Sequence, residues 1–178
     1  MRRGLVRGVA VILAVIAIAF VAQRLFGDKT TIGTVRVPVP VATIGSGEDA
    51  VAVAADGEVV PWWPLADESE LPRLPLAEPP ESGRLAGPML EQARVLGAAP
   101  AALRPYLASS YYGESGVDVE TSSGIELHFG DASQAARKWK AAAAVLADPT
   151  ITALDYVDLQ APGHPAYGGS GHTLPTLP

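Results

Sequence analysis

An uninterrupted apolar stretch opens the chain. Apart from Arg7 and Arg24, residues 5–26 are uncharged and mostly Val, Ala, Ile or Leu. With these two arginines reaching toward the lipid headgroups, a helix of this length spans about 33 Å, enough to cross a hydrocarbon core of about 30 Å. The pattern predicts a transmembrane helix over residues 8–26 behind a cytoplasmic stub, residues 1–7.

Positive charge predicts the orientation of this segment. Arg2, Arg3 and Arg7 precede it, and the charges after it nearly cancel, so the N-terminus is expected in the cytoplasm and the rest of the chain outside it. A cleaved signal peptide is the alternative, because Ala17-Ile18-Ala19 offers a small-x-small pattern after an apolar core. Either reading exports residues 30–178.

Alternating patterns follow a short linker, residues 27–33. Valines alternate with other residues over 34–44, which predicts a half-buried strand that is at a sheet edge or irregular, because its prolines cannot donate to a ladder. Asp56-Gly57, between weakly alternating residues 50–55 and the run 58–60, predicts a hairpin.

Prolines dominate the next twenty residues, 61–80. This composition predicts an extended segment that crosses the domain rather than a helix or a free linker. Five large apolar residues are expected to dock it onto the core: Trp62, Trp63, Leu71, Leu74 and Leu76.

Helical spacing appears twice in the second half. A first helix is expected from Pro88 to a stop near Gly97. A second follows Asp131, with Gln134 three residues on as a capping box, and continues to Ala147.

Strand patterns at 117–121, 125–129 and 153–160 complete the expected elements. Without regular alternation of strands and long helices, this order predicts an α+β domain with a mainly antiparallel sheet and two helices, over residues 34–160. Residues 161–178 are expected to form a flexible Pro/Gly-rich tail.

Composition and spacing argue against several classes of function. The chain has no Cys, and after Arg24 it carries nine Lys or Arg against 19 Asp or Glu, a net charge of −10 that disfavours nucleic-acid binding. His128, His164 and His172 are not at ligand spacing. No catalytic residue, metal, cofactor or small-molecule substrate is therefore expected, which leaves binding chemistry.

The outer edge of the last strand is a template for a partner strand, or is protected by the tail through Pro162 and Pro165.

Ordered blocks of residues resemble the FtsQ/DivIB family of bacterial cell-division proteins. Residues 35–42 and 54–60 are similar to the family's first strand and its Asp-Gly hairpin. The closing blocks are similar too: residues 124–131, Lys138-Trp139, Val145-Leu146-Ala147 and Tyr156-Val157-Asp158-Leu159, followed by Pro162, Pro165 and Gly168.

This resemblance implies a non-enzymatic, single-pass scaffold of the cytoplasmic membrane. Such a protein recruits or stabilises FtsB and FtsL type partners at the division septum, with an extracytoplasmic domain to which a partner strand adds. By position, the edge residues would be Tyr156, Val157, Asp158, Leu159 and Gln160. Lys138 matches the family's helix lysine, for which packing or capping is as good a role as partner contact.

Two features depart from the family pattern. Only residues 27–33 separate the apolar stretch from the first strand, so a short member without the POTRA domain is expected. Gln160 stands where relatives often carry a basic residue, which would remove an exposed ion pair worth about 0–1 kcal/mol.

A different class of function also fits the export signal. A secreted envelope domain, cleaved from its signal peptide, could bind a cell-wall polymer or small ligand through Trp62, Trp63, Tyr111 and Tyr112.

The intact mass of the chain purified from cells separates these readings. We expect the full-length mass in the membrane fraction, because the apolar segment is retained as an anchor. A new N-terminus near Phe20 would contradict the anchored scaffold.

Overall fold

The computed structural model describes residues 37–65 and 71–174. Apart from Val37, these belong to one compact unit, residues 38–178. The expected cytoplasmic stub, transmembrane helix and linker lie outside the described residues. Within the ranges described, no helix is long and apolar enough to cross a membrane.

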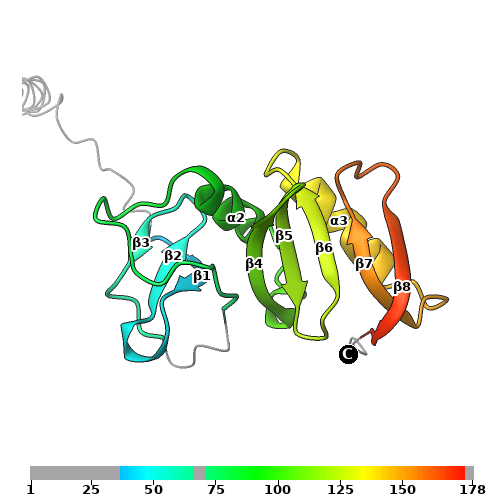
Figure 1. The fold of residues 1–178 in the computed structure, drawn as a ribbon, viewed down its shortest axis with the longest axis horizontal. Helices are drawn as coiled ribbons and strands as arrows, with labels where there is room; N and C mark the ends of the chain where they lie inside the picture. Colours follow the sequence, from blue (N-terminus) through cyan, green and yellow to red (C-terminus); the bar gives the residue numbers. More distant parts are fainter. Residues whose placement is uncertain (1–36, 66–70, 175–178) are drawn as a thin grey trace, which may run out of the picture. The chain divides into compact units, whose positions relative to one another are not determined.

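The described residues form an α+β domain with two α-helices and two groups of strands (Figure 1). Two 3-10 turns, at Gly47–Asp49 and Arg104–Tyr106, connect some of them. In chain order the main elements are β1 (Pro40–Ile44), β2 (Val51–Ala54), β3 (Val59–Val60), α2 (Gly87–Gly97), β4 (Leu107–Gly113), β5 (Gly116–Thr121), β6 (Glu126–Gly130), α3 (Ala135–Leu146), β7 (Ala153–Asp158) and β8 (Ala166–Thr173).

The first sheet has the antiparallel order β1-β2-β3. Its register shifts between Pro40 and Ala42, which agrees with the irregular strand expected from the prolines. Gly57 has a φ of +83° in the turn between β2 and β3, a conformation that glycine adopts without strain.

The second sheet has the order β4-β5-β6-β7-β8. Its pairs are antiparallel except for β6 and β7, which run parallel because α3 carries the chain back between them. The sheet is therefore mainly antiparallel, as the sequence predicts.

The proline-rich segment joins the two sheets through the backbone around Arg73. Thr43 N donates to Pro72 O and Leu74 N donates to Thr43 O, both at 2.9 Å, on the β1 side. Arg73 N donates to Ala108 O at 3.0 Å, and Ser110 N donates to Arg73 O at 2.9 Å, on the β4 side. Of the expected docking residues, Leu74 is fully buried whereas Trp62 is 63% exposed.

The core lies between the strands and the two helices. Trp139 of α3 is fully buried, with its ring centroid 4.7 Å from that of Phe129 in β6. Its Nε1–H donates to Val95 O of α2 at 2.7 Å, so the one polar atom of the indole is satisfied inside the core.

Three sequence-based expectations are corrected. Strand β4 was not expected, because Leu-Ala-Ser-Ser-Tyr-Tyr-Gly carries little apolar alternation. In the structure its register with β5 shifts between Leu107 and Ser109. The capping box at the start of α3 is wrong. Gln134 is itself the N-cap residue, with a φ of +52° and no side-chain cap, while the Asp131 carboxylate accepts from Ser133 and Lys138. Finally, part of the expected flexible tail is strand β8.

The role of the bridging segment can be tested at Leu74. Leu74→Ala removes a buried side chain where the proline-rich segment meets the core. We therefore expect the free energy of unfolding, measured in denaturant titrations, to fall by about 2–5 kcal/mol. Val39→Ala, at a position 62% exposed, is the control and is expected to change stability by less than about 0.5 kcal/mol. Equal effects of the two substitutions would contradict this role.

Candidate partner-binding site

Strand β8 occupies the side of β7 that was expected to be open. Val157 pairs with Tyr167, Asp158 with Ala166 and Tyr156 with Gly168 in an antiparallel ladder. The expectation of β7 as the edge strand is therefore corrected, and protection by the following chain, the alternative drawn from Pro162 and Pro165, is what the structure contains.

The outer edge of the sheet now belongs to β8. This strand ends the order of the second sheet, and no described strand pairs with its other side (Figure 1). Six of its eight residues are exposed, and its sequence, Ala-Tyr-Gly-Gly-Ser-Gly-His-Thr, has no Lys, Glu or Pro of the kind that blunts an edge. Its backbone is therefore open to a further strand.

A glycine-rich bulge limits this open edge. Between Leu154 and Tyr156 the register shifts, with Gly169, Ser170 and Gly171 bulging opposite Asp155. Gly171 N donates to Asp155 Oδ1 at 2.6 Å. At Gly169, with a φ of +87°, a side chain would meet the Asp155 carboxylate, so only glycine fits.

Tyr156 extends from β7 across β8. A Cβ placed on Gly168 would lie 3.2 Å from the Tyr156 hydroxyl, so this ring covers the space that the glycine leaves. Tyr156 is 40% exposed and packs tilted against His128 on its other side, at a centroid distance of 5.8 Å. It therefore presents an aromatic surface next to the edge strand.

The other predicted edge residues, 157–160, differ from this one. Val157 and Leu159 are fully buried in the core, and Leu159 N donates to His128 O at 2.9 Å. Asp158 Oδ1 accepts from Gln160 N at 2.9 Å and so fixes the turn that leads into β8. Gln160 is exposed. Any contact of Val157 and Leu159 with a partner stays a prediction.

Lys138 is a buried cation with three acceptors. Its side chain is 3% exposed, and Nζ donates to Phe129 O at 2.8 Å, Asp131 O at 3.0 Å and Asp131 Oδ1 at 2.7 Å. The hydrogen bonds from Lys138 and Ser133 lower the pKa of Asp131 to about 2. These contacts fix the turn between β6 and α3.

A polar network covers the sheet face opposite the helices. His128 Nδ1 lies 2.7 Å from Asp118 Oδ1, and His128 Nε2 lies 3.7 Å from Glu126 Oε2. The Tyr111 hydroxyl donates to Glu126 Oε1 at 3.0 Å. Burial and then this hydrogen bond, with the charges of the nearby carboxylates, raise the pKa of Tyr111 to about 12. The phenol therefore stays protonated at neutral pH.

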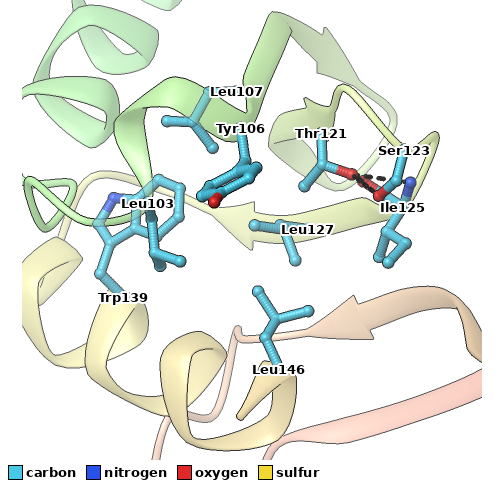
Figure 2. A pocket seen from close by; sticks show the side chains of 9 residues that line it. All are labelled: Leu103, Tyr106, Leu107, Thr121, Ser123, Ile125, Leu127, Trp139 and Leu146. Carbon is cyan, nitrogen blue, oxygen red and sulfur yellow. Dashed lines mark hydrogen bonds between the residues drawn. The ribbon is translucent and has the colours of Figure 1, made fainter. Parts of the chain in front are cut away.

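A small apolar hollow lies on the helix side of the sheet, between the Arg104–Tyr106 turn and α3 (Figure 2). Its volume is about 20 Å³, room for about one water and not for an organic ligand. Thr121 and Ser123 hydroxyls at its rim are already hydrogen-bonded to each other at 3.0 Å. Across residues 37–65 and 71–174, no group of three His, Asp or Glu side chains is arranged to hold a metal ion.

The four aromatic residues of the alternative function do not form one platform. Trp62 and Trp63, with ring centroids 6.1 Å apart, follow β3, and Trp63 packs on the small cluster of Ala52, Ala54 and Val60. Tyr111 and Tyr112 are on β4, with β2, β1 and the bridging segment between them and β3. Neighbouring strand residues also point to opposite faces, which separates Tyr111 from Tyr112.

Residues 42–160 match the family model described as cell division protein FtsQ/DivIB, C-terminal. The chain belongs to the FtsQ/DivIB family. This membership gives it a role in cell division, in a family of divisome-associated membrane scaffolds. No curated protein matches the chain significantly. The matched FtsQ/DivIB region ends at Gln160, before β8, so the edge strand lies outside it.

The Lys138 contacts predict a loss of stability in each of two variants, Lys138→Met and Asp131→Asn. Lys138→Met removes three hydrogen bonds, and Phe129 O keeps only the donor Asp131 N at 3.0 Å, so we expect a cost of about 1–3 kcal/mol in denaturant titrations at pH 7.

The second loss depends on pH. The folded-state pKa of Asp131 lies below its ordinary 3.8, so its stabilising effect is complete above that value and disappears as the pH falls toward about 2. The wild type should therefore exceed Asp131→Asn in stability at pH 6, and this difference should shrink between about pH 4 and pH 2. A difference that stays constant over this range would contradict the pairing.

Proposed function

We propose that this FtsQ/DivIB protein is a bitopic divisome scaffold that recruits or stabilises FtsB and FtsL type membrane proteins during septum formation. A partner strand adds to the outer edge of β8. The observation that carries the proposal is the exposed outer side of this strand, with which no described strand pairs, at the end of the second sheet. Its setting is the cytoplasmic membrane at the septum, with the described domain on the outer side.

The edge of β8 suits strand addition for three reasons. It lacks charged residues, it contains no proline, and it is held in place on one side by five ladder pairs with β7. A paired, preorganised edge needs little further ordering when it accepts a strand, so main-chain hydrogen bonds contribute more to net affinity.

The proposal also accounts for the β7 residues and Lys138. Tyr156 lies over Gly168 and so offers its ring to side chains of the added strand, next to the edge. Asp158 and Gln160 are at the turn that enters β8, while the buried Val157 and Leu159 hold β7 against the core. Lys138 acts on the edge indirectly, through the turn after β6.

The bulge gives the partner strand a defined register. Residues 166–168 pair regularly with β7, whereas the bulge held by Asp155 interrupts the ladder immediately after them. A strand added at 166–168 therefore has one favourable alignment and cannot slide past the bulge.

Proline substitutions test the edge directly. Neighbouring residues of a strand direct their N–H groups to opposite sides, so Tyr167→Pro and Gly168→Pro each remove one donor, one toward β7 and one at the outer edge. Leu159 N donates to His128 O on the β6 side, so Tyr156 and Asp158 face β8, and their partners Gly168 and Ala166 face β7. Tyr167→Pro is therefore the variant that loses the outer donor. It should keep its melting temperature, and should bind the FtsB type partner at least about tenfold more weakly, about 1.4 kcal/mol.

Tyr167→Ala is the matched control, since it keeps the N–H group and should bind nearly as the wild type does. Affinity of the full-length chain for the partner is measured in detergent, alongside its melting temperature. If the stably folded proline variant binds as tightly as its alanine control, strand addition at β8 is wrong.

A further inference from the structure

The strands of the second sheet carry acidic side chains but no Lys or Arg. All seven Lys and Arg of the described ranges lie outside strands β4 to β8: Arg73, Arg84, Arg94, Arg104, Arg137, Lys138 and Lys140. The same five strands carry five carboxylates: Asp118, Glu120, Glu126, Asp155 and Asp158. These five strands therefore carry carboxylates but no Lys or Arg of their own.

Four of these carboxylates share one face. Glu120 is directly opposite Glu126 in the β5–β6 ladder, and Asp118 is opposite His128. His128 is in turn opposite Asp158 in the β6–β7 ladder. Directly opposed residues point to the same side of a sheet, so the four carboxylates surround His128 on three adjacent strands.

This face is the one that the helices do not cover. The intervening residues Val119, Leu127 and Val157 are fully buried on the side of the core. In Figure 1 α3 lies behind β6 and β7, α2 lies beside β4, and no described helix or strand crosses the near side of β4 to β8. The tyrosine rings of Tyr111 and Tyr156 flank the carboxylates on this open face.

The arrangement is unfavourable for the isolated domain. Like charges directly opposite each other destabilise a sheet, and Glu120 and Glu126 form such a pair. The cation nearest along the sheet is Arg73, which has interactions of its own and lies beyond β4, opposite Ser109. The carboxylates of β6 and β7 are the furthest from it.

We propose that the open face of β4 to β8 is a docking surface for an arginine-bearing segment of a partner protein. A guanidinium group bonds carboxylates in a bidentate manner and stacks on aromatic rings, and this face offers both between Tyr111 and Tyr156. Its charge disfavours anionic lipid headgroups and nucleic acid. It also disfavours a second copy, because the chain after Arg24 is itself acidic. The carboxylates of this surface lie on β5 to β7 and not at the outer side of β8, so the proposal does not depend on strand addition there; Tyr156 borders both surfaces.

The test uses the full-length chain in detergent and a fluorescent peptide of four Arg-Thr repeats, with a Lys-Thr peptide of equal length beside it. We expect saturable binding by anisotropy, tighter for the arginine peptide. Glu120→Gln with Glu126→Gln should weaken it at least about tenfold, because two charge-assisted contacts are lost.

Glu78→Gln with Glu81→Gln is the matched control. Both residues are exposed outside the sheet, and the net charge changes by the same amount. This control should leave the affinity for the arginine peptide within about twofold of the wild-type value. It keeps the open face intact and alters only the long-range attraction between the chain and the peptide.

Three results would overturn the proposal. The first is that the wild type fails to bind the arginine peptide. The second is that the two double variants lose affinity equally. The third is that sedimentation shows self-association of the wild type through this face, with only Glu120→Gln with Glu126→Gln separating the copies. The proline variants of β8 report on strand addition alone, so the two proposals fail independently.

Discussion

The backbone around Arg73 is the constraint on which this domain depends. Residues 72–74 hydrogen-bond to β1 on one side and to β4 on the other, so two separate groups of strands become one continuous hydrogen-bonded surface. Without this link, β1 and β4 would each expose a row of unpaired backbone groups. The Leu74 side chain buried beside the link contributes to the same core as Trp139, so backbone pairing and apolar packing stabilise the same arrangement.

Continuity of the strands leaves the domain with one covered face, one open face and a free edge at β8. The covered face is apolar and occupied by α2 and α3. The open face is acidic and the free edge is nearly uncharged, so they favour different chemistry: guanidinium contacts on the face, and main-chain pairing at the edge. A protein whose family role is to hold other division proteins together has use for two surfaces of different chemistry, which meet at Tyr156.

The sequence predicts those elements that have one buried apolar face and one exposed polar face. The hairpin at Asp56-Gly57, the start of α2 at Gly87-Pro88 and the body of α3 follow from turn chemistry and apolar spacing. Strand β8 could not be found in this way, because both of its faces are largely exposed and its stability comes from the ladder with β7 and the Asp155 contact. Strand β4 is similar, with Ser109 and Tyr111 held by Glu120 and Glu126 from other strands. The sequence therefore placed the sheet edge one strand too early, and the contacts of Lys138 depend on acceptors that only the folded turn brings together.

Amide hydrogen exchange of the full-length chain, with and without its FtsB type partner, tests the central claim most directly. Addition of a strand at β8 predicts that binding protects amides within residues 166–168 that exchange freely in the unbound protein, while the amides of β1 to β3 are unchanged. Protection confined to β1 to β3 or to the helices, with the outward-facing amide of residues 166–168 still exchanging freely, would contradict the account.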